Sequence, residues 1–345
     1  MCMLTAYVGD RPIAPLMLRA TQLQEPFGGA HATGMAVIDG GSIRIEKDFG
    51  HVSRVMSTTE IESLKGTTGI AHTRYSGKLM RDPRHNTKEK AHPYIDDTGK
   101  IVLMHNGDFN NYQELWDELK SSHTFRSYSE DVDDITDSEV TVHMLSDRLA
   151  EGMTMEEGLR NIARRLNGTF LLCVITVDQP ETVWIANWHQ RCVVGVGEDE
   201  AMFCSSHIGF HEVEDGFRIF EPPKNSIIKL TRGKVEISPM DPERVVPNLE
   251  VDKCELGGRI LDMLKKGTEL DYKVMERALN KDGMAQALGI GQERYREYMR
   301  EGVSIVNPLI QTLEMLLRKG YIEERIDMRA EGGVEDTPRY SYSLA

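Results

Sequence analysis

The sequence predicts an α+β protein in which a large sheet-built domain is followed by a small, mainly helical one. Short apolar runs separated by turn residues recur over residues 1–238, and helical patterns lie in groups between sets of strands. Beyond a proline-rich stretch, the pattern changes to a series of helices, which one strand pair follows at the end. Strands and helices grouped in this way are typical of two packed sheets rather than of a regular βαβ fold. We therefore expect domains at 1–238 and 255–345, joined by a linker at 239–254.

Length and composition favour a soluble two-domain protein. Of its 345 residues, 40% are hydrophobic and 28% are charged, which is enough to bury more than one core. No apolar run approaches the roughly 20 residues of a membrane span, and the start lacks the basic-then-apolar order of a signal peptide. We expect a cytoplasmic protein that does not bind membranes. The net charge of −14 also argues against broad affinity for nucleic acid.

Cys2 is the candidate nucleophile. Removal of Met1 would give this residue both a thiol and a free α-amine, and an amine with a pKa of about 8 can accept the thiol proton. The alternative is a buried cysteine that opens an apolar strand. The five cysteines contain no CxxC pair, so neither a zinc site nor a disulfide framework is indicated, and no metal is expected.

Arg74 is a candidate anion-binding residue at the end of a strand. A strand at 1–8, a helix at 12–24 and a hairpin of strands at 35–38 and 43–47 precede it. The next strand, at 67–76, ends in polar residues, where an arginine is held rigidly and can bind a carboxylate through two hydrogen bonds. A surface ion pair is the alternative for Arg74. The polar segment 78–90 is expected to be a mobile loop able to cover a site.

Asn106 and Gly107 are expected at the end of a buried strand at 101–104. An Asn-Gly pair there supplies a side-chain amide and an unobstructed backbone N–H, which are the donors of an oxyanion hole. A simple turn is the alternative. A helix at 112–119 follows. The segment 136–140 then leads into a second helix at 140–150, with Asp137 near its start, where it is either a site residue or only a helix cap. The remaining strands of the domain are expected at 168–177, 183–188, 191–196, 201–205, 226–230 and 234–237.

Five segments in this order resemble the class II glutamine amidotransferase domain, with similarity over roughly residues 2–240. That domain belongs to the N-terminal-nucleophile hydrolases, whose fold is a four-layer αββα sandwich, and it requires no cofactor. Single motifs of this kind are weak signals, but these five in this order, beginning with Cys2, are specific. The segments are Cys2, 72–76 (HTRYS), 91–93 (AHP), 105–107 (HNG) and 136–140 (TDSEV).

The resemblance implies a role for each candidate residue. Cys2 would attack the side-chain amide of L-glutamine, and Asn106 and Gly107 would stabilise the oxyanion. Arg74 would hold the α-carboxylate and Asp137 the α-ammonium of this substrate. This assignment agrees with the chemistry, since a zwitterion needs one cationic and one anionic anchor. Ammonia would leave first, and water would then cleave the γ-glutamyl thioester to glutamate.

Three positions depart from the family pattern and leave an alternative open. Met3 stands where a glycine usually follows the nucleophile, Gly77 replaces a threonine, and Lys90 replaces an asparagine. A glutamine-sensing regulator that binds without turnover is therefore the competing function. Another N-terminal-nucleophile hydrolase acting on an acyl amide is a third, although it would leave Arg74 and Asp137 without a zwitterion to bind.

The second domain contains no recognisable synthase, so we expect ammonia to pass to a separate synthase subunit. Its pattern resembles a winged helix. Residues 255–345 hold 14 Lys+Arg and 16 Asp+Glu, a net charge of −2 that disfavours DNA binding and favours protein docking or self-association. An arginine-rich stretch at 293–301 leaves DNA binding as an alternative function of this domain. The alternative interpretation of that stretch is a solvated helix face. Helices are expected at 256–264, 272–279, 284–288, 293–299 and 307–319, and strands at 320–325 and 339–342.

Overall fold

The computed structural model describes residues 2–244, 252–267, 269–279, 285–286, 289–300, 308–331 and 334–345. The chain divides into two compact units, Met1–Val245 and Val246–Ala345. Part of the expected linker, residues 245–251, lies outside the described residues. Within the described ranges, no helix combines the length and the apolar character needed to cross a membrane.

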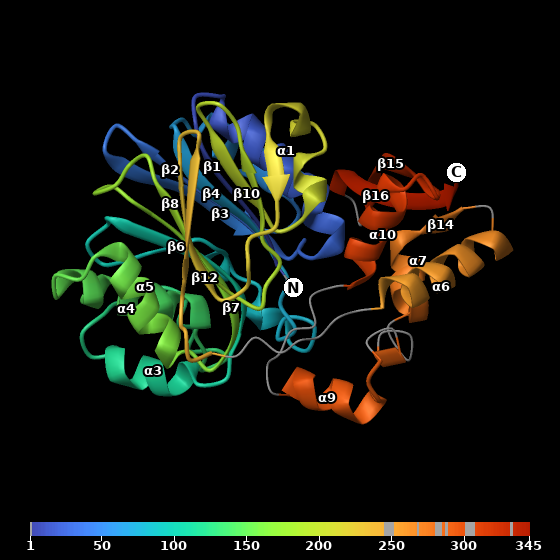
Figure 1. Ribbon diagram of the computed structural model, residues 1–345. Coiled ribbons are helices and arrows are strands. Elements are labelled where there is room, and N and C mark those ends of the chain that lie inside the picture. Colours follow the sequence, from blue (N-terminus) through green and yellow to red (C-terminus); the bar gives the residue numbers. More distant parts are fainter. Residues whose placement is uncertain are drawn as a thin grey trace. The chain divides into compact units, whose positions relative to one another are not determined.

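The first unit is built on two antiparallel sheets (Figure 1). The first has seven strands in the order β11-β9-β10-β1-β4-β2-β3, and β1 lies near its centre with every residue buried. A strand covered on both faces is predominantly apolar, and β1 is apolar except for the buried Thr5, whose hydroxyl is hydrogen-bonded. The bounds are β1 (Met3–Val8), β2 (Ala32–Asp39), β3 (Ser42–Phe49), β4 (Thr68–Arg74), β9 (Val193–Val196), β10 (Ala201–Cys204) and β11 (Arg218–Phe220).

The second sheet has six strands in the order β13-β12-β8-β7-β6-β5. Its central strand β7 is buried at all nine positions, and it pairs with β6 along the full length of that strand. The bounds are β5 (Tyr94–Ile95), β6 (Ile101–Phe109), β7 (Gly168–Thr176), β8 (Val183–Trp188), β12 (Ser226–Thr231) and β13 (Lys234–Pro239).

Three hydrophobic cores separate the layers of this unit. One core lies between the two sheets, a second joins α1 and α2 to the seven-stranded sheet, and a third joins α3, α4 and α5 to the six-stranded sheet. The layers therefore run helices, sheet, sheet, helices, and the prediction of a mixed domain with two packed sheets is confirmed. The bounds are α1 (Ile13–Gln24), α2 (Val52–Thr58), α3 (Tyr112–Leu119), α4 (Asp137–Ala150) and α5 (Met155–Arg165), with short 3₁₀ helices at Glu25–Phe27, Ile61–Ser63, Pro83–His85, Lys88–Lys90, His207–Phe210 and Glu214–Gly216.

The structure corrects the predicted end of one strand. We expected the strand at 101–104 to stop before Asn106, but β6 continues to Phe109 because β7 pairs with it throughout, including Asn106 with Leu171 and Gly107 with Phe170. The short strands β5 and β11 and helices α2 and α5 were not predicted. The sequence does contain a signal for the start of α5, because Thr154 and Glu157 have the spacing of a capping box and form one in the structure.

The second unit contains helices and one three-stranded sheet. Its strand order is β14-β16-β15, so the predicted strand pair is confirmed and is joined by one short extra strand. Of the expected helix at 284–288, only residues 285–286 lie within the described residues. The bounds are α6 (Lys253–Lys266), β14 (Leu270–Asp271), α7 (Tyr272–Leu279), α9 (Gln292–Arg300), α10 (Pro308–Arg318), β15 (Ile322–Glu331) and β16 (Val334–Leu344).

Candidate active site

Cys2 lies where the two sheets of the first unit meet. It directly precedes β1, whose neighbour β4 ends beside it because Met3 pairs with Thr73. The Cys2 backbone N–H donates to Asn106 Oδ1 of the facing sheet at 3.0 Å. The backbone N–H of Tyr75 donates to Cys2 Sγ at 3.4 Å. Cys2 therefore lies against both the end of β4 and the middle of β6.

The thiol of Cys2 is buried, with 9% of the residue exposed. Burial raises its pKa above the ordinary value for cysteine, and the Tyr75 hydrogen bond and the positive charge of Arg74 act in the opposite direction. A buried thiol of this kind needs a base to form the nucleophilic thiolate.

The Asn106 side chain is held at both ends. Its Oδ1 accepts from Cys2, and its Nδ2 donates to Gln190 Oε1 at 3.3 Å. Gln190 is itself fixed, because its Nε2 donates to Thr169 Oγ1 at 3.1 Å and its backbone N–H donates to Asn187 Oδ1 at 3.1 Å. Sequence reasoning missed Gln190, and no local pattern marks it, since it follows β8 far along the chain from Asn106.

Gly107 follows Asn106 in a backbone conformation that favours glycine. Its φ is +138°, and a Cβ atom at this position would lie 1.9 Å from the carbonyl oxygen of Thr169. The peptide of Gly107 therefore lies close to the neighbouring strand in a way that no side chain would permit.

Arg74 is the last residue of β4 and is buried, with 8% of its surface exposed. One guanidinium nitrogen, Nη1, donates to the carbonyl oxygen of His85 at 3.5 Å. Among the described residues, no carboxylate lies within 4.0 Å of this guanidinium, so the alternative interpretation of Arg74 as part of a surface ion pair finds no partner there. A mostly buried cation without a carboxylate partner in the described chain is suited to bind an anionic ligand.

Asp137 is the first residue of α4 and is ionised. Burial opposes the charge of its carboxylate, but the proximity of His105 and hydrogen bonds from Ser138 keep its pKa below the usual value. The distances are 3.7 Å from Asp137 Oδ2 to His105 Nδ1 and 2.8 Å from the Ser138 backbone N–H to Asp137 Oδ1. The helix cap is Thr136 rather than Asp137.

Three buried histidines support Asp137 and β6, and sequence reasoning gave them no role. Ser138 Oγ lies 2.7 Å from His92 Nε2 and 3.1 Å from His105 Nδ1. His72 stacks on His92 with ring centroids 3.9 Å apart, and its Nε2 donates to the carbonyl oxygen of His105 at 3.1 Å. Burial lowers the pKa of His72 to about 3 and that of His92 well below its ordinary value, so both rings are neutral at pH 7.

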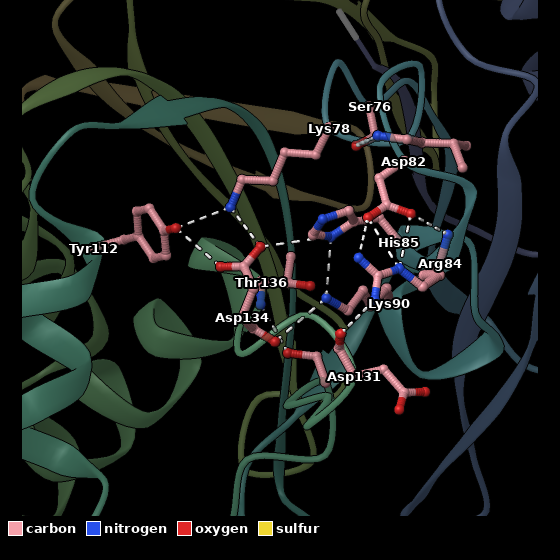
Figure 2. Close-up of polar contacts among 12 residues, drawn as sticks. Ser76, Lys78, Asp82, Arg84, His85, Lys90, Tyr112, Asp131, Asp134 and Thr136 are labelled. Carbon is pink, nitrogen blue, oxygen red and sulfur yellow. Dashed lines mark hydrogen bonds and ion pairs between the residues drawn. The ribbon is translucent and has the colours of Figure 1, made fainter.

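The polar loop 78–90 is anchored, contrary to the expectation of a mobile loop. Figure 2 shows Asp134 between Lys78, Tyr112 and His85. Lys78 Nζ donates to Asp134 Oδ2 at 2.6 Å and the Tyr112 hydroxyl donates to Oδ1 at 2.9 Å, while Lys90 Nζ donates to the backbone oxygen of Asp134 at 3.3 Å. The loop is thereby joined to the segment before α4, and its contact with Arg74 through His85 fixes one wall beside that residue.

The structure brings all five predicted residues into one region of the first unit. Cys2 contacts Asn106, Gly107 continues the same strand, and Arg74 directly precedes Tyr75, whose N–H contacts the thiol. Asp137 lies against His105, the residue before Asn106. In such a region a thiol can attack an amide carbon while amide donors stabilise the oxyanion. A cation and a carboxylate can bind the two charges of a zwitterion.

Comparison with known proteins agrees with this arrangement. A family model described as a glutamine amidotransferase domain matches residues 80–202. The chain is 31% identical over 209 residues to the glutamine–fructose-6-phosphate aminotransferase of Thermococcus kodakarensis and 33% identical over 209 residues to that of Pyrococcus horikoshii. These matches cover 60% of this chain, but only 32% and 33% of the two relatives. The chain thus spans about a third of the length of these curated relatives.

A solved structure shows a similar fold. Glutamine phosphoribosylpyrophosphate amidotransferase from B. subtilis superposes with a TM-score of 0.60 at 17% identity, covering 84% of this chain and 64% of that one. The fold of this chain therefore agrees with the family indicated by its sequence. The first unit has the fold of the N-terminal-nucleophile hydrolases. It contains a class II glutamine amidotransferase domain, and this domain belongs to a family of enzymes.

Proposed function

We propose that the chain hydrolyses L-glutamine to L-glutamate and ammonia, with Cys2 as the nucleophile. The observation that supports this most directly is the placement of Cys2 against Asn106, beside a buried Arg74 without a carboxylate partner among the described residues. The carboxylate of Asp137 supplies the opposite charge nearby. A pure sensor would need the two charges but not the thiol and the amide donors together.

In the proposed mechanism, removal of Met1 frees the α-amine of Cys2, which accepts the proton of its own thiol. The thiolate forms a bond to the amide carbon of the glutamine side chain, and the carbonyl electron pair moves to its oxygen. Asn106 Nδ2 has a second hydrogen beyond the one it donates to Gln190, and this hydrogen and the Gly107 N–H stabilise the oxyanion.

Collapse of this intermediate breaks the C–N bond. The α-ammonium of Cys2 returns its proton to the leaving nitrogen, which departs as ammonia and leaves a γ-glutamyl thioester. Water, deprotonated by the same amine, then attacks the thioester carbon, so that glutamate leaves and the thiol is restored. Arg74 holds the α-carboxylate of the substrate by a charge-assisted pair, and Asp137 holds its α-ammonium.

The ammonia acceptor is proposed to be a separate synthase subunit. Each curated relative named above is about three times the length matched here, so the amidotransferase part is only a fraction of those proteins. The free thiols among the described cysteines suit a reducing compartment, and we place the protein in the cytoplasm.

The second unit is proposed to be a winged-helix-like docking domain. Its order of α6, β14, α7, further helices and the β15–β16 hairpin, with β14 paired to β16, supports this topology. The net charge of −2 over residues 255–345 favours a protein partner or a second copy of the chain over DNA. Affinity capture with the intact chain and with a chain ending at residue 245 tests this, since recovery of one synthase with both would exclude the second unit as the dock.

Substitution of the nucleophile tests the proposed activity. Cys2→Ala should abolish ammonia release while the circular dichroism spectrum is unchanged, and Cys254→Ala, at an exposed cysteine of the second unit, should keep full activity. Mass spectrometry should find a mature chain that begins at Cys2. Retained Met1 would contradict the mechanism, and tight glutamine binding without ammonia release by the wild-type chain would favour the sensing regulator instead.

A further inference from the structure

A second cluster of chemically active side chains lies on the helical side of the six-stranded sheet. Asp97 belongs to the turn between β5 and β6, His123 follows α3, and His143 lies in α4, about 9 Å along that helix from Asp137. One ligand atom from each of the three residues lies within 4.8 Å of the others. None of them takes part in the proposed glutamine chemistry.

The distances between these atoms suit a common metal ion. His123 Nδ1 lies 3.1 Å from Asp97 Oδ2, and His143 Nδ1 lies 3.7 Å from the same oxygen. Ligands about 2.1 Å from a tetrahedral zinc ion are separated from one another by roughly 3.4 Å. The two observed separations lie on either side of that value, so a small movement of the side chains would bring all three atoms into contact with one ion.

The surroundings of His143 support a metal site independently of these distances. His143 is fully buried, and neither of its ring nitrogens has a hydrogen-bond partner among the described residues. A buried polar group without a partner costs about 1–3 kcal/mol, so native structures rarely leave one. A bound cation would account for a side chain that is otherwise unexplained.

His123 has the outer hydrogen bond that metal-binding histidines usually make. Its Nε2 lies 3.1 Å from Asp147 Oδ1, while Nδ1 is directed toward Asp97. A carboxylate that accepts from the remote nitrogen fixes the tautomer and turns the other lone pair toward the ion. Without a metal, His123 would still lie between the carboxylates of Asp97 and Asp147, but that arrangement supplies no hydrogen-bond partner to His143 among the described residues.

We propose that Asp97, His123 and His143 bind one divalent transition-metal ion of the zinc class, with water as the fourth ligand. Two imidazole nitrogens and one carboxylate are a common ligand set for zinc. The side chain of Asp97 is 33% exposed, so the site has access to solvent on that side. Sequence reasoning expected no metal because it looked for paired cysteines, whereas these ligands come from three separate segments and form no spacing motif.

The ion would connect the β5–β6 turn, the end of α3 and the middle of α4. Because α4 begins with Asp137 and β6 contains Asn106, metal binding would stabilise the elements that hold the amidotransferase site. Binding to the folded state alone raises stability in proportion to the logarithm of metal concentration over Kd.

Titration calorimetry with zinc on the intact chain, first treated with a chelator, tests the proposal. The wild type should bind one equivalent of zinc at this site, and its thermal midpoint should rise with zinc. Asp97→Asn and His123→Asn should each weaken binding at least 100-fold and abolish the zinc-dependent rise. Asp147→Asn, which alters only the outer hydrogen bond, should weaken binding about 10- to 100-fold.

Cobalt distinguishes a built site from scattered surface binding. Co²⁺ in the wild type should give the intense visible absorption of a four-coordinate ion, which Asp97→Asn should lack. The control is His211→Gln, outside the cluster, which should bind both metals like the wild type. Equal zinc binding by the wild type and the Asp97 and His123 variants, or none by the wild type, would overturn the proposal. Since no readout uses ammonia release, failure here leaves the proposed hydrolysis unaffected.

Discussion

The conformation of Gly107 restricts this single position to glycine. Its φ of +138° is strained for other residues, and the Thr169 carbonyl oxygen occupies the space of a Cβ atom. The same peptide supplies one of the two proposed oxyanion donors. Gly107 is therefore needed both for the close approach of β6 to β7 and for the proposed stabilisation of the oxyanion.

Gly107→Ala should lose both stability and activity. The methyl group would force β6 away from β7, which should lower the free energy of unfolding by about 1–3 kcal/mol and reduce kcat for ammonia release at least 10-fold. Urea denaturation and steady-state kinetics measure the two effects. Gly77→Ala is the matched control, because its φ is not in the left-handed region and a Cβ there would meet nothing within 4 Å. Wild-type stability in Gly107→Ala would contradict the observed geometry.

At the scale of elements, the loop at 78–90 depends on one carboxylate. Asp134 accepts from both Lys78 and Tyr112 and lies 3.6 Å from His85 (Figure 2). A partly buried hydrogen-bonded ion pair contributes more than an exposed one, so its loss should release the loop.

Asp134→Asn should make the loop accessible to trypsin. We expect cleavage after Arg81 or Arg84 to become several-fold faster than in the wild type, because the loop would open more often. Asp131→Asn is the control, since Arg84 contacts Asp131 through its backbone oxygen, which the substitution keeps. Time-resolved mass spectrometry of the fragments measures the rates, and equal rates for both variants would show that Asp134 does not anchor the loop.

Helix α5 should depend on its capping box. Thr154 Oγ1 accepts from the Glu157 backbone N–H at 3.3 Å, and the Glu157 carboxylate accepts from the Thr154 N–H at 2.8 Å. Thr154→Ala should lower the free energy of unfolding by about 1 kcal/mol without a change in the urea m value. The exposed Ser121→Ala should change it by less than about 0.5 kcal/mol. A capping variant indistinguishable from this control would refute the assignment.

At the scale of the whole molecule, the buried histidines make the fold sensitive to acid. The pKa of His72 is about 3 in the folded chain against an ordinary value of 6.5, and that of His92 is also depressed. Between pH 6.5 and about 3 the unfolded chain therefore binds protons that the folded chain does not. Their contribution to stability is present above pH 6.5 and is lost as the pH falls.

Urea denaturation between pH 7 and pH 4.5 should show this loss. Each histidine contributes a slope that approaches about 1.4 kcal/mol per pH unit well below pH 6.5. His72→Gln should have a shallower slope than the wild type whatever its stability at pH 7, while His211→Gln should keep the wild-type slope. A His72→Gln chain with the unchanged slope would mean that His72 does not titrate in this way.

Local pattern and motif order in the sequence determined most elements of the first unit and the five candidate residues. The strands were predictable because β1 and β7 are buried on both faces and are therefore predominantly apolar. Cys2, Arg74, Asn106, Gly107 and Asp137 were found because each stands in a short segment of recognisable residue types. Their roles in catalysis and binding stay predictions until the variants are measured.

Only the tertiary structure decided which distant side chains meet. The register of β6 on β7 extended a strand that local pattern ended early, and it placed Gly107 against Thr169. The structure brings Gln190 beside Asn106, 84 residues away in the chain. It also brings together Asp97, His123 and His143, which are at least 20 residues apart. Local periodicity reports how each residue faces its own element, whereas such contacts depend on how whole sheets and helices pack, which no local window of the sequence contains.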